Sequence, residues 1–348
     1  MKNQREERGR RIFDGDLCAQ RMSKSMKKFC LAILVILVAS AVFVACGNEP
    51  EIGGDAVRVA AMRGPTAMGL LGLMDAAERG DTRNDYAFEI LGSPDLVPPL
   101  FVQGEVDVAA VPGNLAAILH NRMDVRALAI VTLGVLHIVD VTGEVHSVED
   151  LRGRTVFVSG QGATPEFALN YVLRQNGLVP GEDVIIDFRA EHTEIAALLQ
   201  TGAAEIALLP EPFVSTVLAQ TDGLRVALDL SEEWDKVQPD YGLIMSVVVA
   251  RREFVEQNPE AVAIFLEEYA ASVEFVNSRV TEAAELASTF DIIPNPSIAE
   301  SAIPRTNIVF VTGEEMRKNL EGFLGVLYEA EPQSIGGEMP ERPFYFMP

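Results

Sequence analysis

The sequence predicts an α/β fold built from two similar lobes, and two observations support this. Apolar segments typical of buried strands alternate with amphipathic helical segments, a pattern that favours parallel-type sheets covered on both faces. A shift of 98 residues also superposes residues 57–74 on 155–172, and residues 100–115 on 198–213, without a gap. A constant offset that aligns two different turns indicates two copies of one structural unit. A chain of 348 residues is long enough for two cores.

The first 45 residues belong to neither lobe. Lysines precede an apolar run from Leu31 to Ala45, which is shorter than the ~20 residues that a membrane-spanning helix needs. A basic start, a short apolar segment and a small residue before the cut are typical of a secretory signal peptide. We expect an N-terminal extension and signal peptide over residues 1–45, with Met1, Met22 or Met26 as the start. Residues 46–56 then form a polar tether.

Removal of the signal peptide makes the chain more acidic. The formal net charge of the whole sequence is −23. The first 45 residues hold nine Lys and Arg against four Asp and Glu, so the remainder carries −28. A chain this acidic is a poor partner for nucleic acid. Cys46 is the only cysteine left after the cut, which excludes a disulfide framework.

Each copy begins with a strand that leads through a glycine-containing turn into a helix. The turn is "RGPT" (63–66) in the first copy and "GQGAT" (160–164) in the second. In the second copy, Thr164 is the expected N-cap and Pro165 the first helical residue. Each copy continues with a second strand, a helix that ends at glycine, and a short buried strand that ends at proline. Ligands of such sheets bind beyond the carboxyl ends of the strands, so we expect a cleft between the lobes.

The "GQGATP" turn lacks the signatures of a nucleotide site. A phosphate loop needs a Lys-Ser or Lys-Thr pair after its glycines, but Ala163 and Thr164 follow Gly162. The third glycine of a dinucleotide fingerprint is replaced by Pro165. An ordinary strand-to-helix connection and a helix start that binds a ligand both fit this turn. Its pairing with the "RGPT" turn favours the ligand site.

The remaining segments leave and re-enter the lobes. Residues 126–141 lead out of the first lobe, and residues 224–230 and 241–250 lead out of the second. Amphipathic helices over 251–278, interrupted at Pro259, and over 314–330 return the chain to the first lobe. We expect the glycine- and proline-rich tail to lie over the surface. The predicted boundaries are 57–140 plus 243–348 for lobe I and 141–242 for lobe II.

Three longer segments and the "FVAC" lipobox carry a family resemblance. The segments are "SVEDLRGRTVFVSGQGATPEFALNYVLRQNGL", "LLQTGAAEIALLPEPFVSTVL" and "VVVARREFVEQNPEAVAIFLEEY". They resemble the substrate-binding lipoproteins of ABC importers in the nitrate, sulfonate, taurine and thiamine-precursor group, over about residues 55–335. The resemblance implies a type II periplasmic-binding-protein fold with two crossovers. Phe43 replaces the usual leucine of the lipobox.

The resemblance also implies a function. The chain would be a monomeric binding protein and not an enzyme. Lipid attached to Cys46, including palmitate, would anchor it at the extracytoplasmic face of the cell membrane. It would capture a small organic solute, sulfonate-, taurine- or pyrimidine-like, and deliver it to a permease with a cytoplasmic ATPase. No cofactor and no metal are implied.

The ligand loops carry over position by position. Arg63 would pair an anionic group, Asn114 and Thr132 would orient the ligand, and Glu211 would favour an amine, so that Arg63 with Glu211 would suit a zwitterion. Phe213 or Phe101 would stack on a flat ligand, and each also fits a core position. The expected ligand-binding residues are Arg63, Gly64, Pro65, Thr66, Ser93, Pro112, Gly113, Asn114, Thr132, Gly134, Gln161, Gly162, Ala163, Thr164, His192, Glu211 and Phe213.

An enzyme on the same fold is the alternative, because menaquinone-pathway enzymes and thiamine pyrimidine synthases are similar in lobe architecture and fold does not decide function. The sequence has no Gly-x-Ser-x-Gly elbow and no carboxylate pair that stands out as acid and base. The four histidines lack metal-like spacing. The lipobox favours the binding protein, because cytoplasmic biosynthesis has no use for a lipid anchor.

Overall fold

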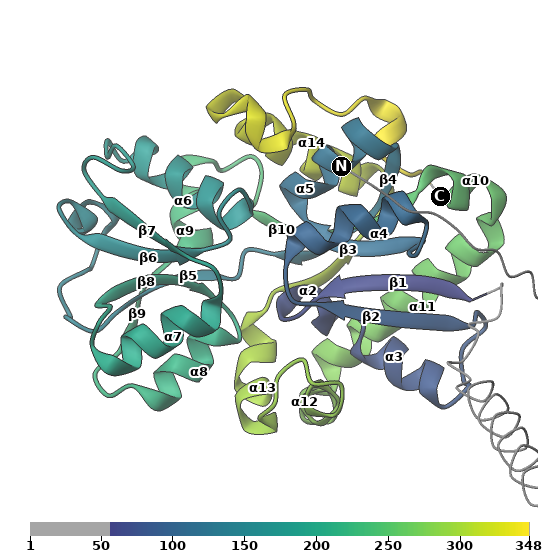
Figure 1. Ribbon diagram of the computed structural model, residues 1–348, viewed down its shortest axis with the longest axis horizontal. Coiled ribbons are helices and arrows are strands. Elements are labelled where there is room, and N and C mark those ends of the chain that lie inside the picture. Colours follow the sequence, from purple (N-terminus) through teal and green to yellow (C-terminus); the bar gives the residue numbers. More distant parts are fainter. Residues whose placement is uncertain (1–55, 348) are drawn as a thin grey trace, which may run out of the picture. The chain divides into compact units, whose positions relative to one another are not determined.

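The computed structural model describes residues 56–347. The predicted signal peptide, Cys46 and all of the tether before Ala56 lie outside the described residues. The described chain forms two α/β lobes, each built around its own sheet, in the type II periplasmic-binding-protein arrangement (Figure 1). No helix within residues 56–347 has the length and apolar character that crossing a bilayer requires.

The sheet of the first lobe has the strand order β11-β4-β10-β3-β1-β2. Strands β1, β2 and β3 are parallel, and β10 lies antiparallel between β3 and β4. The sheet is therefore mixed rather than wholly parallel. Its strands are β1 (Val57–Met62), β2 (Tyr86–Leu91), β3 (Val108–Pro112), β4 (Val125–Leu133), β10 (Ile244–Arg251) and β11 (Ile308–Val311).

The sheet of the second lobe has the order β7-β6-β8-β5-β9, with β5 antiparallel between β8 and β9. This is the order of the first sheet read from β2 to β4, so that β7, β6, β8, β5 and β9 correspond to β2, β1, β3, β10 and β4. Strands β3 and β8 lie 98 residues apart, and the helices before them end at Gly104 and Gly202, both left-handed with φ of 69° and 73°. The structure thus matches the sequence offset. The strands are β5 (Leu136–Asp140), β6 (Thr155–Ser159), β7 (Ile185–Arg189), β8 (Ile206–Pro210) and β9 (Arg225–Asp229).

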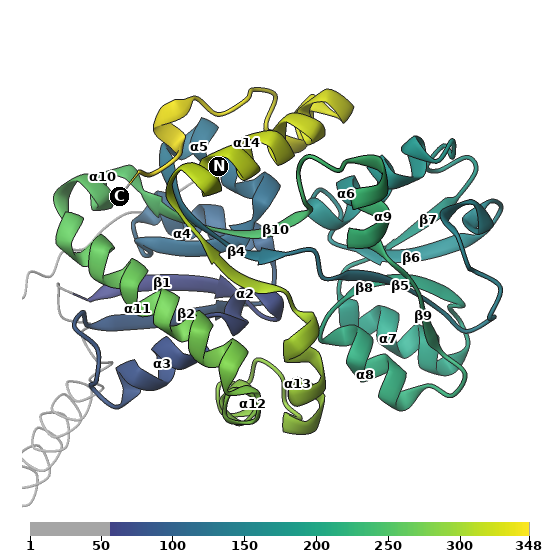
Figure 2. The same ribbon diagram turned by 180° about the vertical axis from the view of Figure 1, so that it is seen from behind.

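Helices cover both faces of each sheet, because successive strand residues face opposite ways. In β1, Val59 and Ala61 pack into one core and Ala60 into another. Figures 1 and 2 show the helices of the two lobes on both sides of their sheets. The first lobe carries α2 (Pro65–Met68), α3 (Leu71–Glu78), α4 (Val97–Gln103), α5 (Gly113–Met123), α10 (Arg252–Gln257), α11 (Pro259–Ser278), α12 (Val280–Thr289), α13 (Pro296–Ala302) and α14 (Gly313–Ala330).

The second lobe carries fewer helices, which likewise cover both faces of its sheet. They are α6 (Thr164–Gln175), α7 (His192–Thr201), α8 (Phe213–Gln220) and α9 (Leu230–Val237). Short 3-10 helices complete the described chain: η1 (Pro94–Leu96), η2 (Val148–Leu151), η3 (Ile303–Arg305), η4 (Pro332–Ile335) and η5 (Arg342–Phe344).

Three local expectations differ from the structure. Strand β5 pairs only with strands of the second sheet, so the chain changes sheets at residues 134–135 and not at 140/141. Helix α6 begins at Thr164 with Ala163 as the residue before it, so Thr164 is not the N-cap. The tail is not confined to the surface, because Phe344 and Tyr345 are buried against β4.

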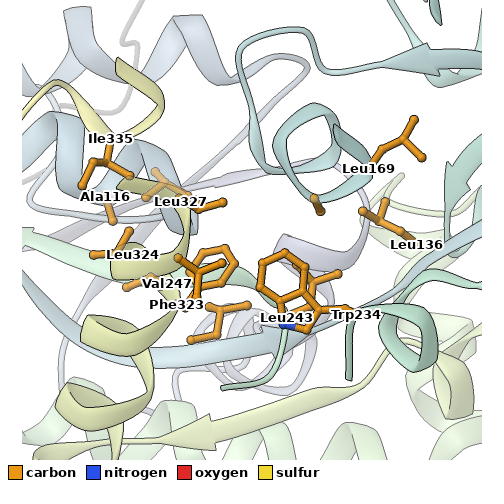
Figure 3. Close-up of a cluster of buried hydrophobic side chains, with 14 of the residues drawn as sticks. Ala116, Leu136, Leu169, Trp234, Leu243, Val247, Phe323, Leu324, Leu327 and Ile335 are labelled. Carbon is orange, nitrogen blue, oxygen red and sulfur yellow. The ribbon is translucent and has the colours of Figure 1, made fainter. Parts of the chain in front are cut away.

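One hydrophobic cluster joins the two lobes (Figure 3). Trp234 of α9 is fully buried, and its ring centroid lies 4.8 Å from that of Tyr171 in α6 and 5.8 Å from that of Phe323 in α14. Its indole N–H donates to the Tyr241 carbonyl at 2.8 Å, so burial leaves no polar atom of this ring unpaired. Because α14 belongs to the first lobe and α6 and α9 to the second, the lobes share a continuous core.

Candidate functional site

The carboxyl ends of the parallel strands of both sheets surround a cavity of about 310 Å³. This is where ligands of open α/β sheets bind. The wall is largely apolar and rich in proline, with a few hydroxyl groups, one imidazole and two charged side chains. The lining residues are Met62, Arg63, Pro65, Thr66, Gly92, Ser93, Pro94, Pro112, Val135, Ser159, Gly160, Ala163, Pro165, Ala190, Glu191, His192, Thr193, Pro210, Phe213, Met245 and Ser246.

On the side of the second lobe, His192 and Ser159 form a hydrogen-bonded pair. Ser159 is the last residue of β6 and His192 the first of α7, so two neighbouring strand ends bring them together. The Ser159 Oγ contacts His192 Nδ1, and the imidazole packs on Phe213 with 4.7 Å between ring centroids. Burial lowers the pKa of His192 to about 4. The ring is therefore neutral at neutral pH, and its Nε2 atom has no hydrogen bond within the described chain.

On the side of the first lobe, two hydroxyl groups and one cation face the cavity. Thr66 Oγ1 and Ser246 Oγ lie 3.1 Å apart, and both residues are buried. Arg63 lies exposed at the rim, where its Nη1 is 2.9 Å from Asp291 Oδ2. On this side of the cavity the two buried hydroxyl groups are uncharged, and the cation lies at the rim.

A second hollow of about 450 Å³ adjoins the cavity and shares six lining residues with it. Three predicted ligand residues line this hollow but not the main cavity: Asn114, Gln161 and Gly162. Asn114 joins the lobes here: its Nδ2 donates to the Gly162 carbonyl at 3.2 Å, and its Oδ1 accepts from Thr164 Oγ1 at 3.1 Å. The asparagine therefore binds the opposite lobe.

Eight predicted residues line the main cavity itself. They come from the turns after the parallel strands of both lobes, as the sequence indicated. These are Arg63, Pro65, Thr66, Ser93, Pro112, Ala163, His192 and Phe213.

Six predicted residues line neither hollow, for different reasons. Gly64 has a φ of 106°, which favours glycine, and a Cβ there would meet no atom within 4 Å. Gly113 faces Phe323 in the core, and Thr132 is buried within β4. Gly134 lies where the chain changes sheets, and Thr164 bonds to Asn114. The sixth is Glu211, whose side chain is fully buried.

Glu211 is occupied by protein partners. Its Oε1 lies 2.8 Å from Arg305 Nε, and its Oε2 accepts from the backbone N–H and the hydroxyl of Ser215 at 3.1 and 2.7 Å. The carboxylate that the predicted zwitterion site requires is therefore not available to a ligand, whereas Arg63, exposed at the rim, pairs with Asp291. The side chain of Glu211 turns away from the cavity because a buried carboxylate needs a countercharge, and Arg305 supplies it.

Several lining residues were not predicted. Ser159 is the last residue of β6, one residue before the "GQGAT" turn. Its position at the end of a parallel strand could have identified it as a lining residue. Met245 and Ser246 come from β10, whose insertion between β3 and β4 has no short-range signature. Among residues 56–347, no three His, Cys, Asp or Glu side chains are grouped so that they could hold a metal ion.

Solved structures with the same architecture cover most of this chain. An ABC transporter protein from Parabacteroides distasonis is 23% identical with a TM-score of 0.70, covering 84% of this chain and 99% of its own. The periplasmic aliphatic sulphonate binding protein SsuA from Escherichia coli is 18% identical with a TM-score of 0.68, covering 85% and 93%.

The alkanesulfonate-binding protein SsuA from Xanthomonas axonopodis pv. citri, bound to MOPS, is 13% identical with a TM-score of 0.64, covering 83% and 95%. At these identities the likenesses establish the fold. A search of curated proteins gave no match.

The family assignment comes from a family model described as "Menaquinone biosynthesis", which matches residues 65–329. The match spans both lobes and the cavity, and it names the group that the sequence offered as the alternative on this fold. The chain belongs to the menaquinone biosynthesis family.

Proposed function

We propose that the chain is an extracytoplasmic binding protein that captures a small organic solute between its lobes and delivers it to an ABC permease. The observation that carries the proposal is the cavity, whose polar groups come from both lobes: Thr66 and Ser246 from the first, Ser159 and His192 from the second. A solute that bonds to both sides stabilises the closed arrangement by its differential affinity for it. The likeness to sulfonate-binding proteins supports this reading at the level of fold.

The geometry favours a solute with a neutral or weakly charged polar group and a flat apolar part. Phe213 and His192 offer ring faces, and the hydroxyl groups offer hydrogen bonds without a full charge. A pyrimidine-like solute fits this set better than a zwitterion, since Glu211 and Arg63 are both paired. A lipid on Cys46 would hold the protein at the membrane, beside the permease.

A thermal-shift screen tests the proposal. Taurine, alkylsulfonates, nitrate, pyrimidines and riboflavin-like compounds are added to the purified protein. A solute at 100 times its dissociation constant raises the free energy of unfolding by ~2.7 kcal/mol. Phe213→Ala should abolish the shift, whereas Phe275→Ala, at a residue that lines neither hollow, should keep it. A screen in which no compound shifts the transition, or in which Phe213→Ala keeps the shift, contradicts the proposal.

An enzyme of menaquinone biosynthesis is the second candidate, favoured by the family match and by the Ser159–His192 pair in the cavity. An imidazole held neutral and bonded to a hydroxyl is able to accept or relay a proton. The test is conversion of candidate menaquinone precursors, followed by mass spectrometry. Product formation that is lost in Ser159→Ala would establish this candidate, and binding without conversion would exclude it for the precursors tested.

A further inference from the structure

An ion pair between a buried carboxylate, Glu211, and an exposed guanidinium, Arg305, connects the lobes beside the cavity. Glu211 follows β8 of the second lobe and has no exposed surface. Arg305 ends η3, which precedes β11 of the first sheet. Its Nε lies 2.8 Å from Glu211 Oε1, and its Nη2 donates to Ser215 Oγ. The carboxylate thus has one countercharge, and that countercharge comes from the opposite lobe.

The same carboxylate organises the start of α8. Its Oε2 accepts from the Ser215 backbone N–H at 3.1 Å, which places negative charge at a helix N-terminus. Phe213, two residues after Glu211, begins this helix and forms the cavity wall against His192. The position of the Phe213 ring therefore depends on the group that Arg305 holds.

The segment around Arg305 also contacts the point where the chain changes lobes. Asn307 donates to the Gly134 carbonyl, and the Leu133 N–H donates to the Asn307 carbonyl at 3.1 Å. Helix α13, just before Arg305, packs against α8, and Figures 1 and 2 both show the two helices side by side. Arg305 thus lies between the crossover and the cavity wall.

We propose that Arg305 and Glu211 form an interlobe clasp that sets how far the cleft opens, with Arg305 as a positioning residue that acts through Glu211 on Phe213. Separation of the lobes on this side leaves a buried carboxylate without its countercharge, which is strongly unfavourable. The Asn114 bridge across the adjoining hollow consists of hydrogen bonds between uncharged groups, which are weaker. The inference refines the proposed solute-binding site, but its test requires no solute.

Hydrogen exchange of backbone amides in the full-length chain tests the clasp. Arg305→Gln should increase exchange about tenfold in residues 190–193 and 211–216, which form the cavity wall next to the clasp. Glu211→Gln should act similarly, and the double variant should show no more than the larger single effect, because both remove one interaction. Arg317→Gln is the matched control: its partners Glu314 and Glu321 lie on its own helix, so both segments should exchange as in the wild type.

Fluorescence of Trp234, the only tryptophan of the chain, separates a positioning role from general destabilisation. The clasp predicts unchanged emission in Arg305→Gln, because the shared hydrophobic core remains intact, together with faster exchange near the cavity. Wild-type exchange rates in both segments overturn the proposal. Faster exchange throughout residues 56–347 with a red-shifted Trp234 emission also overturns it. A solute screen without any hit would contradict the proposed function and leave this result unaffected.

Discussion

A shift from pH 8 to pH 5 is expected to destabilise the fold through His192. Burial lowers the pKa of this histidine to about 4 in the folded chain, whereas an unfolded histidine titrates near pH ~6.5. Between these values the unfolded chain binds a proton that the folded chain excludes. Stability therefore falls as the pH falls. The contribution of the neutral ring is fully present above the unfolded pKa and is lost as the pH approaches the folded one.

The size of the effect follows from the two pKa values. Linkage gives a loss of about 2 kcal/mol at pH 5 relative to pH 8 for one group with these values. His192 is half-buried by its exposed surface, so solvent screening reduces this figure. We expect a measured loss of about 1–2 kcal/mol. Other groups titrate in the same range, so the effect of His192 is isolated by comparison with a variant.

Urea unfolding at pH 8, 6.5 and 5, monitored by Trp234 emission, is the assay. His192→Gln retains a polar side chain that does not titrate, so wild type and variant should diverge by about 1–2 kcal/mol over this range. His146→Gln, at an exposed histidine, should follow the wild type. If wild type and His192→Gln lose stability in parallel between pH 8 and pH 5, the fold does not hold this imidazole neutral.

Three further predictions concern the anchor, the crossover and the shared core. Cys46→Ser should release the protein from membranes or leave it unprocessed, and mass spectrometry that finds no lipid on wild-type Cys46 would contradict the anchor. Gly134→Ala should cost about 1–3 kcal/mol in urea unfolding, because its Cβ would lie 2.8 Å from the Cβ of Ser231; Ser231→Gly should restore most of that loss, and no restoration would refute the clash. Trp234→Ala should cost about 3–5 kcal/mol by circular dichroism, with Trp234→Phe milder, and equal losses would argue against a packing role.

The repeat was the part of the fold that the sequence predicted best. The offset aligns turns and strand ends, and these are local features set by glycine, proline and apolar runs. It also anticipates the shared strand order of the two sheets. The positions of β5 and β10 within their sheets could not be predicted from the sequence, because they depend on pairing between residues far apart in the chain. For the same reason the first crossover was placed about five residues late.

The candidate site was predicted in part. Turn residues such as Thr66 and Ala163 reach the cavity because they follow parallel strands. Glu211 follows such a strand as well, yet its side chain turns away toward Arg305. The sequence offers no signal for that partner, which is 94 residues further along the chain. Which polar group faces a cavity depends on the countercharges that the rest of the fold supplies.

The insertion of β10 has a consequence for the order in which the chain folds during synthesis. The second sheet uses only residues 136–229 and is complete once that stretch has emerged. The first sheet has a gap between β3 and β4 until Ile244–Arg251 has been made. The strands β1 to β4 of the first lobe therefore keep unpaired edges while the second lobe folds. A nascent chain arrested before residue 244 would present two separate sheet edges and would depend on holding factors to avoid aggregation.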